Sequence, residues 1–356
     1  MDSIISSQGC LSRICTKAAS FMWTSPSKEP GTWRLLRSSF RRVFAGLVAS
    51  ALISSPALAD TFPGKPVRII IGVSVGGLAD NMTRMMAAEL QERWGQPVIV
   101  ESKPGASGAI AAGAVARSPA DGYTLAMVIS TYATNPSLKK DLGYDPKFPM
   151  VPVTMLARAP TVLLTGAKSD IHVFGDLVAK AKADPNSYAY GSAGAGGMTH
   201  LVGELVNESV GLKLLHVPYK GGAPALNDLL GGQIPLQFST ISTIYQHYKG
   251  GTVRALAIAA AERDVSMPEV PTFKELGYPD VIVEEWYALV APYGTPDSVV
   301  KAISKEVTDV LKMPAIREKL VGLNLGGTSP SETQAFIDGE MARWGKFIEV
   351  NDIKTQ

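Results

Sequence analysis

Two glycine-rich segments of the sequence contain the residue types and spacings that could do chemistry. The first, segment 72–76, reads Gly-Val-Ser-Val-Gly and follows an apolar β-branched run. Its Gly-x-Ser-x-Gly spacing is that of a nucleophile elbow, a strand-to-helix turn that exposes a serine to an ester. This spacing makes a secreted serine hydrolase that uses Ser74 an alternative hypothesis. Against it, the elbow would lie on the first strand of the mature chain, and no His-Gly-Gly segment precedes it to form an oxyanion hole.

The same segment also fits an anion-binding loop. Gly76 and Gly77 allow a tight turn that exposes backbone N–H groups at the start of the next helix. The helix dipole adds partial positive charge at that end, which suits a carboxylate. Asp80 has the wrong sign to face an anion, so we expect it to cap the helix or to accept hydrogen bonds that fix the loop. A plain strand–helix turn without a ligand remains the third interpretation.

The second segment, 191–200, reads Gly-Ser-Ala-Gly-Ala-Gly-Gly-Met-Thr-His. Thr199 stands where a dinucleotide fingerprint needs its third glycine, and the Gly-Lys-Ser/Thr of a P-loop is missing, so nucleotide binding is disfavoured. We predict instead that the two amide-rich helix starts hold a small carboxylate between them. The residues expected in this second loop are Ser192, Ala193, Gly194, Ala195, Gly196, Thr199 and His200. His200 is either a hydrogen-bond donor near the ligand or an ordinary helix histidine.

Composition excludes several other classes of function. The chain has 356 residues, of which 46% are hydrophobic and 19% charged. Its first 59 residues carry 7 basic and 2 acidic side chains, which leaves 27 basic and 30 acidic ones in the rest. A mildly acidic body without a basic stripe argues against nucleic acid as a partner. The four histidines have no paired spacing, so we predict neither a metal site nor a cofactor.

The N-terminal region has the pattern of an export signal. Four arginines precede the apolar run 43–53, and residues 57–59 read Ala-Leu-Ala. This run is too short to span a bilayer, which needs about 20 residues. We therefore predict cleavage between Ala59 and Asp60 and a periplasmic location, by either the general or the twin-arginine route. Cys10 and Cys15 both precede the site, so the mature chain would have no disulfide and no thiolate.

Apolar β-branched runs alternate with helical patterns along the mature chain, which predicts α/β architecture with a mostly parallel sheet. The same rhythm restarts after Pro160. We therefore predict two lobes, with residues 60–160 and 285–356 in lobe 1 and residues 161–284 in lobe 2. The missing linker indicates that the chain crosses between the lobes more than once. Expected strands are 67–71, 97–101, 123–128, 161–165, 188–190, 214–217 and 253–259; expected helices include 109–116, 174–183, 198–210 and 224–230.

In these segments the sequence resembles the Bug-type solute-binding receptors of tripartite tricarboxylate transporters. The most specific stretch is 216–226, His-Val-Pro-Tyr-Lys-Gly-Gly-Ala-Pro-Ala-Leu. Residues 62–68, 119–125, 268–272 and 291–296 also match the family, and Val75 to Asp80 corresponds to its Pro-Gly-Gly-x-x-Asp loop. Where the family has prolines before the two glycines this chain has Ser74 and Val75, so we include Ser74, whose Oγ could reach the ligand, among the expected ligand-binding residues. The resemblance implies a type II periplasmic-binding-protein fold with a ligand cleft between two lobes and no catalysis. It also implies delivery of a small carboxylate to a large and a small membrane permease subunit, and we expect a monomer.

The resemblance also directs attention to further candidate residues. Ser130 and Thr131 follow the expected strand 123–128 and would line the cleft, as would Trp286 and Tyr287, for which core packing is the alternative. Ser239 stands where receptors for acidic amino acids have an aspartate for the ligand ammonium. A buried ammonium without a carboxylate partner is costly, so we predict a ligand without an amino group: a di-, tri- or aromatic carboxylate. A binding protein that only informs a regulatory partner, without a permease, remains an alternative.

Overall fold

The computed structural model describes residues 62–146, 149–320 and 322–354. The predicted export signal, its cleavage site and both cysteines lie outside the described residues. Within the described stretches, no helix is both long and apolar enough to cross a membrane.

The first group of strands is parallel and comes from the N-terminal part of the described chain. Strand β1 (Val67–Ile71) pairs with β2 (Val98–Ser102) on one side and with β3 (Thr124–Ile129) on the other. The β-branched side chains of β1 are almost entirely buried, as expected for a strand covered on both faces. The helices of this part are α2 (Leu78–Trp94), the short 3₁₀ turn η1 (Ala106–Gly108), α3 (Ala109–Ala116), α4 (Thr131–Leu138), α9 (Asp297–Leu311) and α10 (Pro314–Arg317).

The second group of strands repeats this arrangement. Strand β5 (Ala189–Ser192) is parallel to β6 (Leu215–Pro218) on one side and to β7 (Leu236–Thr240) on the other. A helix follows each of these strands, because polar or glycine-rich turns end the strand and an amphipathic pattern begins. The helices of this part are α5 (Phe174–Ala183), α6 (Met198–Val210), α7 (Gly222–Leu230) and α8 (Ile241–Lys249).

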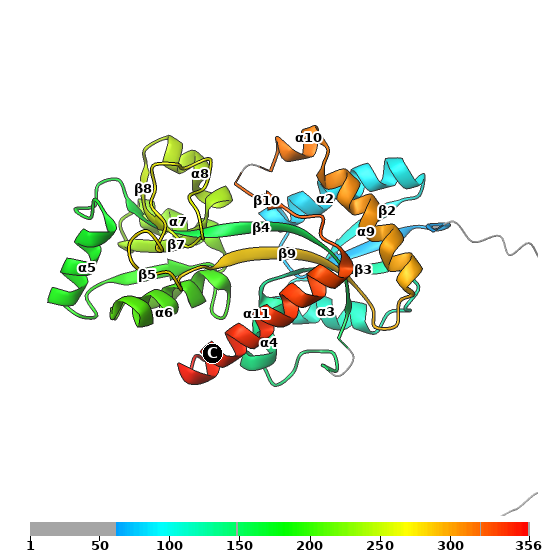
Figure 1. The fold of residues 1–356 in the computed structure, drawn as a ribbon, viewed down its shortest axis with the longest axis horizontal. Coiled ribbons are helices and arrows are strands. Elements are labelled where there is room, and N and C mark those ends of the chain that lie inside the picture. Colours follow the sequence, from blue (N-terminus) through cyan, green and yellow to red (C-terminus); the bar gives the residue numbers. More distant parts are fainter. Residues whose placement is uncertain (1–61, 147–148, 321, 355–356) are drawn as a thin grey trace, which may run out of the picture. The chain divides into compact units, whose positions relative to one another are not determined.

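Two long strands connect the groups. The 16-residue strand β4 (Val151–Gly166) pairs with β9 (Glu284–Ala291) over Val151–Pro160, and with β7 and β8 (Val253–Ile258) from Thr161 onward. Figure 1 shows β4 and β9 running side by side from one group of strands to the other. The chain thus passes between the two groups of strands more than once. The lobe boundaries near 160 and 284 stay a prediction, although the partners of β4 change at Pro160/Thr161.

The expectation of a mostly parallel sheet is wrong at its centre. The pairings of β9 with β3 and β4 are antiparallel, as are those of β4 with β7, β8 and the short strand β10 (Asn324–Leu325). Crossing strands must run in opposite directions, because β4 leaves the first group and β9 returns to it. The local pattern of apolar residues indicates which side chains are buried, but not the direction of the partner strand. The sequence therefore could not predict that β4 and β9 pair antiparallel.

The C-terminal helix α11 (Pro330–Val350) contacts both parts of the protein. Its Ile337 packs in a hydrophobic cluster with Trp286, whereas Trp344 and Ile348 pack in a cluster with Phe174 and Val283. A capping box at Ser329 and Glu332 begins the helix, where each side chain bonds the other residue's backbone N–H. The helix thereby stabilises the region where the two crossing strands lie.

Candidate functional site

The second glycine-rich loop joins the end of β5 to the start of α6. Its helix begins at Met198 with Gly197 as the N-cap and without a side-chain cap. Two side chains of the helix instead reach back to the loop. The hydroxyl of Thr199 accepts from Ala193 N–H at 2.9 Å, and Nδ1 of His200 accepts from Gly196 N–H at 3.1 Å. These bonds fix the loop's backbone before any ligand arrives.

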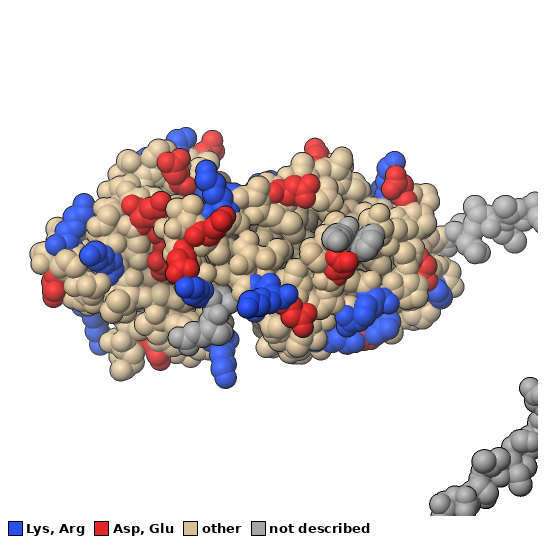
Figure 2. Space-filling view, turned by 90° about the horizontal axis from the view of Figure 1, so that it is seen from below, with Lys and Arg blue, Asp and Glu red and all other residues tan. Residues whose placement is uncertain are grey.

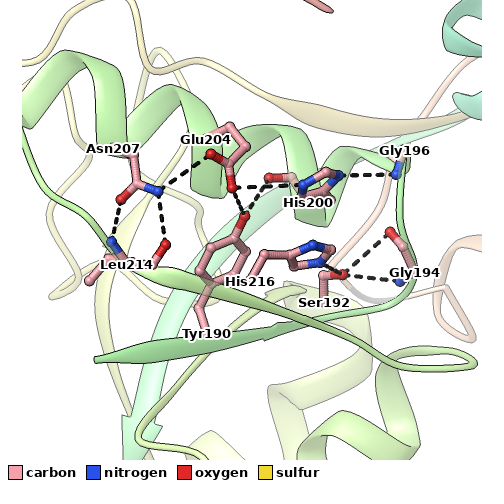
Figure 3. A network of polar contacts seen from close by, with 9 residues as sticks. All are labelled: Tyr190, Ser192, Gly194, Gly196, His200, Glu204, Asn207, Leu214 and His216. Carbon is pink, nitrogen blue, oxygen red and sulfur yellow. Dashed lines mark hydrogen bonds and ion pairs between the residues drawn. The ribbon is translucent and has the colours of Figure 1, made fainter. Parts of the chain in front are cut away.

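The other side of the loop is held through Ser192, the fully buried last residue of β5. Its Oγ lies 2.7 Å from Nε2 of His216, which belongs to β6, and accepts from Gly194 N–H at 3.1 Å. The imidazole of His216 stacks on that of His200, with ring centroids 3.8 Å apart and an interplanar angle of 15° (Figure 3). The two histidines thus support both ends of the loop as one unit.

Burial keeps both imidazoles neutral. Desolvation lowers the pKa of His216 to about 3, helped by the neighbouring His200, and desolvation likewise lowers the pKa of His200 against the opposing pull of Glu204. Because a backbone N–H donates to Nδ1 of His200, the proton of this neutral ring is on Nε2, which faces Glu204 at 3.7 Å. Glu204 also accepts from the hydroxyl of Tyr190 at 2.6 Å (Figure 3).

This arrangement suits an anion. The first-turn N–H groups of Met198 and Thr199 have no partner inside the helix, since the first four N–H groups of any helix lack one. They carry the positive end of the α6 dipole, which favours a carboxylate. The surrounding imidazoles are neutral and act as positioning groups for the loop.

The first glycine-rich loop has a different environment. Ser74, Val75, Gly76 and Gly77 are exposed at the start of α2, whereas Asp80 is only 1% exposed. One oxygen of Asp80 accepts from Gly76 N–H at 2.9 Å, and the other accepts from Nε of Arg84 at 2.8 Å. Asp80 therefore fixes the loop, which confirms one of its two predicted roles; the N-cap itself is Gly77.

The motif spacing around Ser74 has a packing explanation. A Cβ atom on Gly72 would lie 2.6 Å from Cα of Gly108, so only glycine allows this close approach. Among the described residues, Ser74 has no hydrogen bond to a histidine. His200 and His216 instead contact the second loop. No described carboxylate hydrogen-bonds His216 to orient its imidazole toward Ser192 as in a catalytic triad. The described residues therefore give the hydrolase hypothesis no support at Ser74.

Helix α4 connects the first part of the protein to the second loop. The buried hydroxyl of Thr134 donates to Gly196 O at 2.9 Å. At the start of the helix, Thr131 donates to Ser107 O at 2.9 Å, and the backbone N–H and hydroxyl of Ser130 both donate to Glu285. Burial raises the pKa of Glu285 to about 7. The predicted Ser130 and Thr131 thus lie on the helix that touches the second loop.

Trp286 and Tyr287 lie in hydrophobic clusters. Trp286 is fully buried, packs against Phe336 and donates to Glu340 from its indole nitrogen at 3.3 Å; Tyr287 is 6% exposed. This is the core packing considered as the alternative. A contact of either residue with a ligand stays a prediction, and we leave both out of the proposed site.

Three contributors to the site were missed at the sequence level, namely His216, Thr134 and Glu285. His216 begins the family segment 216–226, yet the sequence gives no sign that it stacks on His200, because the contact joins β6 to α6. Thr134 and Glu285 lie far from the loop in sequence, and neither has a distinctive motif. The buried Ser239, the last predicted residue, lies on β7 and is treated below.

Comparisons with known proteins show the family and the fold of the chain. Residues 82–353 match the model of the tripartite tricarboxylate transporter family receptor. The chain belongs to this receptor family. Protein BugT of Bordetella pertussis is 35% identical over 311 residues, which cover 86% of this chain and 95% of BugT.

Solved structures of the family share the fold. Periplasmic binding protein BugD is 31% identical with a TM-score of 0.73. The match covers 83% of this chain and 100% of the BugD chain. Rpa4515 of R. palustris, solved with adipate, is 33% identical with a TM-score of 0.76, over 82% of this chain and 99% of that one. The predicted Bug-type family and periplasmic-binding-protein fold are confirmed. The chain is a solute-binding receptor of this family.

Proposed function

We propose that this receptor captures a small organic carboxylate between its two lobes and delivers it to the large and small permease subunits of a tripartite tricarboxylate transporter. The ligand is a di-, tri- or aromatic carboxylate without an amino group. The protein performs no catalysis and acts in the periplasm as a monomer, after removal of residues 1–59. Rpa4515, a relative, was solved with adipate, which is consistent with this ligand class.

The observation that carries the proposal is the preorganised start of α6. Its first-turn N–H groups have no side-chain cap, and the loop before them is held by Ser192, Thr199 and His200. Donors fixed in advance bind an anion without an ordering cost. Gly77 and the first turn of α2 supply the second, exposed set of donors, on a turn that the Gly76–Asp80 hydrogen bond holds in place. Ser130 and Thr131 would approach from α4.

A thermal-shift screen tests this proposal. The purified protein is heated with a panel of carboxylates, amino acids, sugars and phosphates. A ligand at 100 times its dissociation constant adds about 2.7 kcal/mol of stability, so a binding carboxylate will raise the Tm measurably. We expect carboxylates without an ammonium group to give the shift. A panel in which no carboxylate raises the Tm would contradict the proposal.

Two glycines that flank α2 provide a matched pair of variants. Gly76, before the helix, and Gly95, after it, both have positive φ (90° and 62°) and open space where a Cβ would be. Gly76→Ala and Gly95→Ala should therefore have similar effects on folding. We expect only Gly76→Ala to weaken carboxylate binding, because a strained loop displaces the N–H groups. Equal affinities of the two variants would exclude the first loop from the site.

A further inference from the structure

Three helices begin at the same edge of the second group of strands. The parallel strands lie in the order β7, β5, β6, and α6, α7 and α8 start just beyond their carboxyl ends. None of these helices has a hydrogen-bonded side-chain cap; their N-caps are Gly197, Gly221 and Thr240. The start of α6 binds the carboxylate in the proposed function, whereas that function assigns no ligand group to the start of α7.

Two buried polar groups of β7 lie beneath the start of α7. Ser239 is 2% exposed and Gln237 is fully buried, yet Ser239 Oγ and Gln237 Oε1 have no hydrogen-bond partner among the residues that the structure describes. A buried polar atom without a partner costs free energy and is uncommon in native proteins. Two such atoms on the same face of β7 indicate that a bound molecule supplies their hydrogen bonds.

Both side chains point toward Gly222, the first residue of α7. Gln237 Nε2 donates to Gly222 O at 3.0 Å, and a Cβ on Gly222 would lie 3.6 Å from Ser239 Oγ. The next helix residue, Ala223, is exposed. The unpartnered atoms therefore lie directly under a helix start that solvent reaches.

The chemistry of this place is specific. Gln237 Oε1 is a carbonyl oxygen and can only accept a hydrogen bond, and the bond from Nε2 to Gly222 O fixes which end of the amide it is. Ser239 can donate or accept, and the first-turn N–H groups of α7 donate. The nearby Asp228 on α7 accepts from the hydroxyl of Tyr219 at 2.7 Å. A ligand group that satisfies all of these must both donate and accept, as a hydroxyl or carboxamide does.

We propose that Gln237, Ser239 and the start of α7 form a second subsite, which selects carboxylates carrying a hydroxyl or carboxamide group at their far end. This inference rests on the proposed function and narrows its ligand class. The carboxylate at the start of α6 and the missing amino group are retained, and a hydroxyl or carboxamide takes the place of a second ionised carboxylate at the far end. Gly191 pairs with Gln237, so Ser192 of β5 and Ser239 of β7 lie one strand apart at the same sheet edge. One small molecule can therefore reach both the α6 and the α7 starts. An ionised second carboxylate lacks the proton for Gln237, and an ammonium lacks an acceptor.

Titration calorimetry on the purified protein with two matched series of probes tests the subsite. The first series is hexanoate, 6-hydroxyhexanoate, adipamate and adipate, and the second is butanoate, 4-hydroxybutanoate, succinamate and succinate. In at least one series we expect the hydroxy acid or the amide acid to bind about tenfold tighter than the alkyl acid, the value of one good hydrogen bond. It should also bind tighter than the diacid.

Two variants locate the effect. Ser239→Ala removes the hydroxyl, and Gly222→Ala places a methyl 3.6 Å from Ser239 Oγ, an ordinary van der Waals distance that the fold can accept. Each should abolish the preference for the hydroxy or amide acid and leave binding of the alkyl acid unchanged. Ser304→Ala, at a buried serine of α9, is the matched control and should preserve the preference. Because Ser239 Oγ has no partner, Ser239→Ala should also leave the Tm unchanged or raise it.

The outcomes separate the two proposals. If carboxylates bind but the far-end group makes no difference, or the preference survives in both variants, the subsite is refuted and the receptor function stands. A preference for the diacids would equally refute the subsite, since it would show that an acceptor alone is selected. If none of the probes binds and no other carboxylate raises the Tm, both proposals fail.

Discussion

A buried carboxylate fixes the loop before α2, whereas neutral imidazoles and hydroxyls fix the loop before α6. In the first loop, Asp80 holds Gly76 and is offset by Arg84, which is nearly half exposed. In the second, His200 holds Gly196 and His216 contacts Ser192. A negative group beneath a helix start weakens its attraction for an anion, and a neutral one does not. We therefore predict that the α6 loop contributes most of the carboxylate affinity of the proposed site and that the exposed α2 loop contributes less.

The largest expected effect comes from removing the support of the second loop. His200→Phe keeps the ring stacked on His216 but leaves the buried Gly196 N–H without an acceptor, at a cost of about 1–3 kcal/mol in the free energy of unfolding. Carboxylate affinity should fall as well. Urea unfolding and calorimetry measure the two effects, with His247→Phe on α8 as the control. A wild-type affinity in His200→Phe would show that the loop is fixed by other contacts.

An effect of intermediate size is expected from pH. The folded-state pKa of His216 is about 3 and that of His200 is also lowered from 6.5, so the unfolded chain takes up protons first as the pH falls below 6.5. Stability should therefore decrease from pH 6.5 downward, by up to about 1.4 kcal/mol per pH unit for each histidine. Glu285 acts in the opposite direction: its folded-state pKa of about 7 exceeds the usual 4.5, so its protonation adds stability as the pH falls from 7 to 4.5.

Two variants separate these contributions. The free energy of unfolding is measured by urea at pH 7.5 and pH 5 for His216→Phe, Glu285→Gln and the wild type. His216→Phe should lose less stability on acidification than the wild type, and Glu285→Gln should lose more. Identical pH profiles of His216→Phe and the wild type would mean that this histidine is not held neutral in the folded protein.

The smallest effect is expected at the first loop. Asp80→Asn retains an oxygen for Gly76 N–H but loses the ion pair with the half-exposed Arg84, so stability should fall by less than about 1 kcal/mol. Carboxylate affinity should stay the same or increase, because a negative charge near the helix start is removed. A tenfold loss of affinity in Asp80→Asn, measured by calorimetry, would reverse the ranking of the two loops.

The sequence by itself determined the features that depend on neighbouring residues. Helices 109–116, 174–183 and 198–210 have the predicted bounds, because an amphipathic or small-residue pattern ends at glycine or polar residues at five of the six ends; Val173 precedes the other, where Asp176 caps the helix. The two glycine-rich helix starts and the family were also recognisable, since both depend on short continuous segments. Helix α4 was not predicted, as its mostly polar sequence contains Pro136 and lacks a clear period.

Only the tertiary structure decided how these segments meet. It reversed the direction of the central strands, placed Trp286 in a hydrophobic cluster and stacked His216 of β6 on His200 of α6. It also brought Thr134 to Gly196 and, within the described part of the chain, left Ser239 Oγ and Gln237 Oε1 without a hydrogen-bond partner under α7. The physical reason is that periodicity reports which face of an element is buried. Which polar atom of a distant element it meets, or fails to meet, depends on packing that no local pattern encodes.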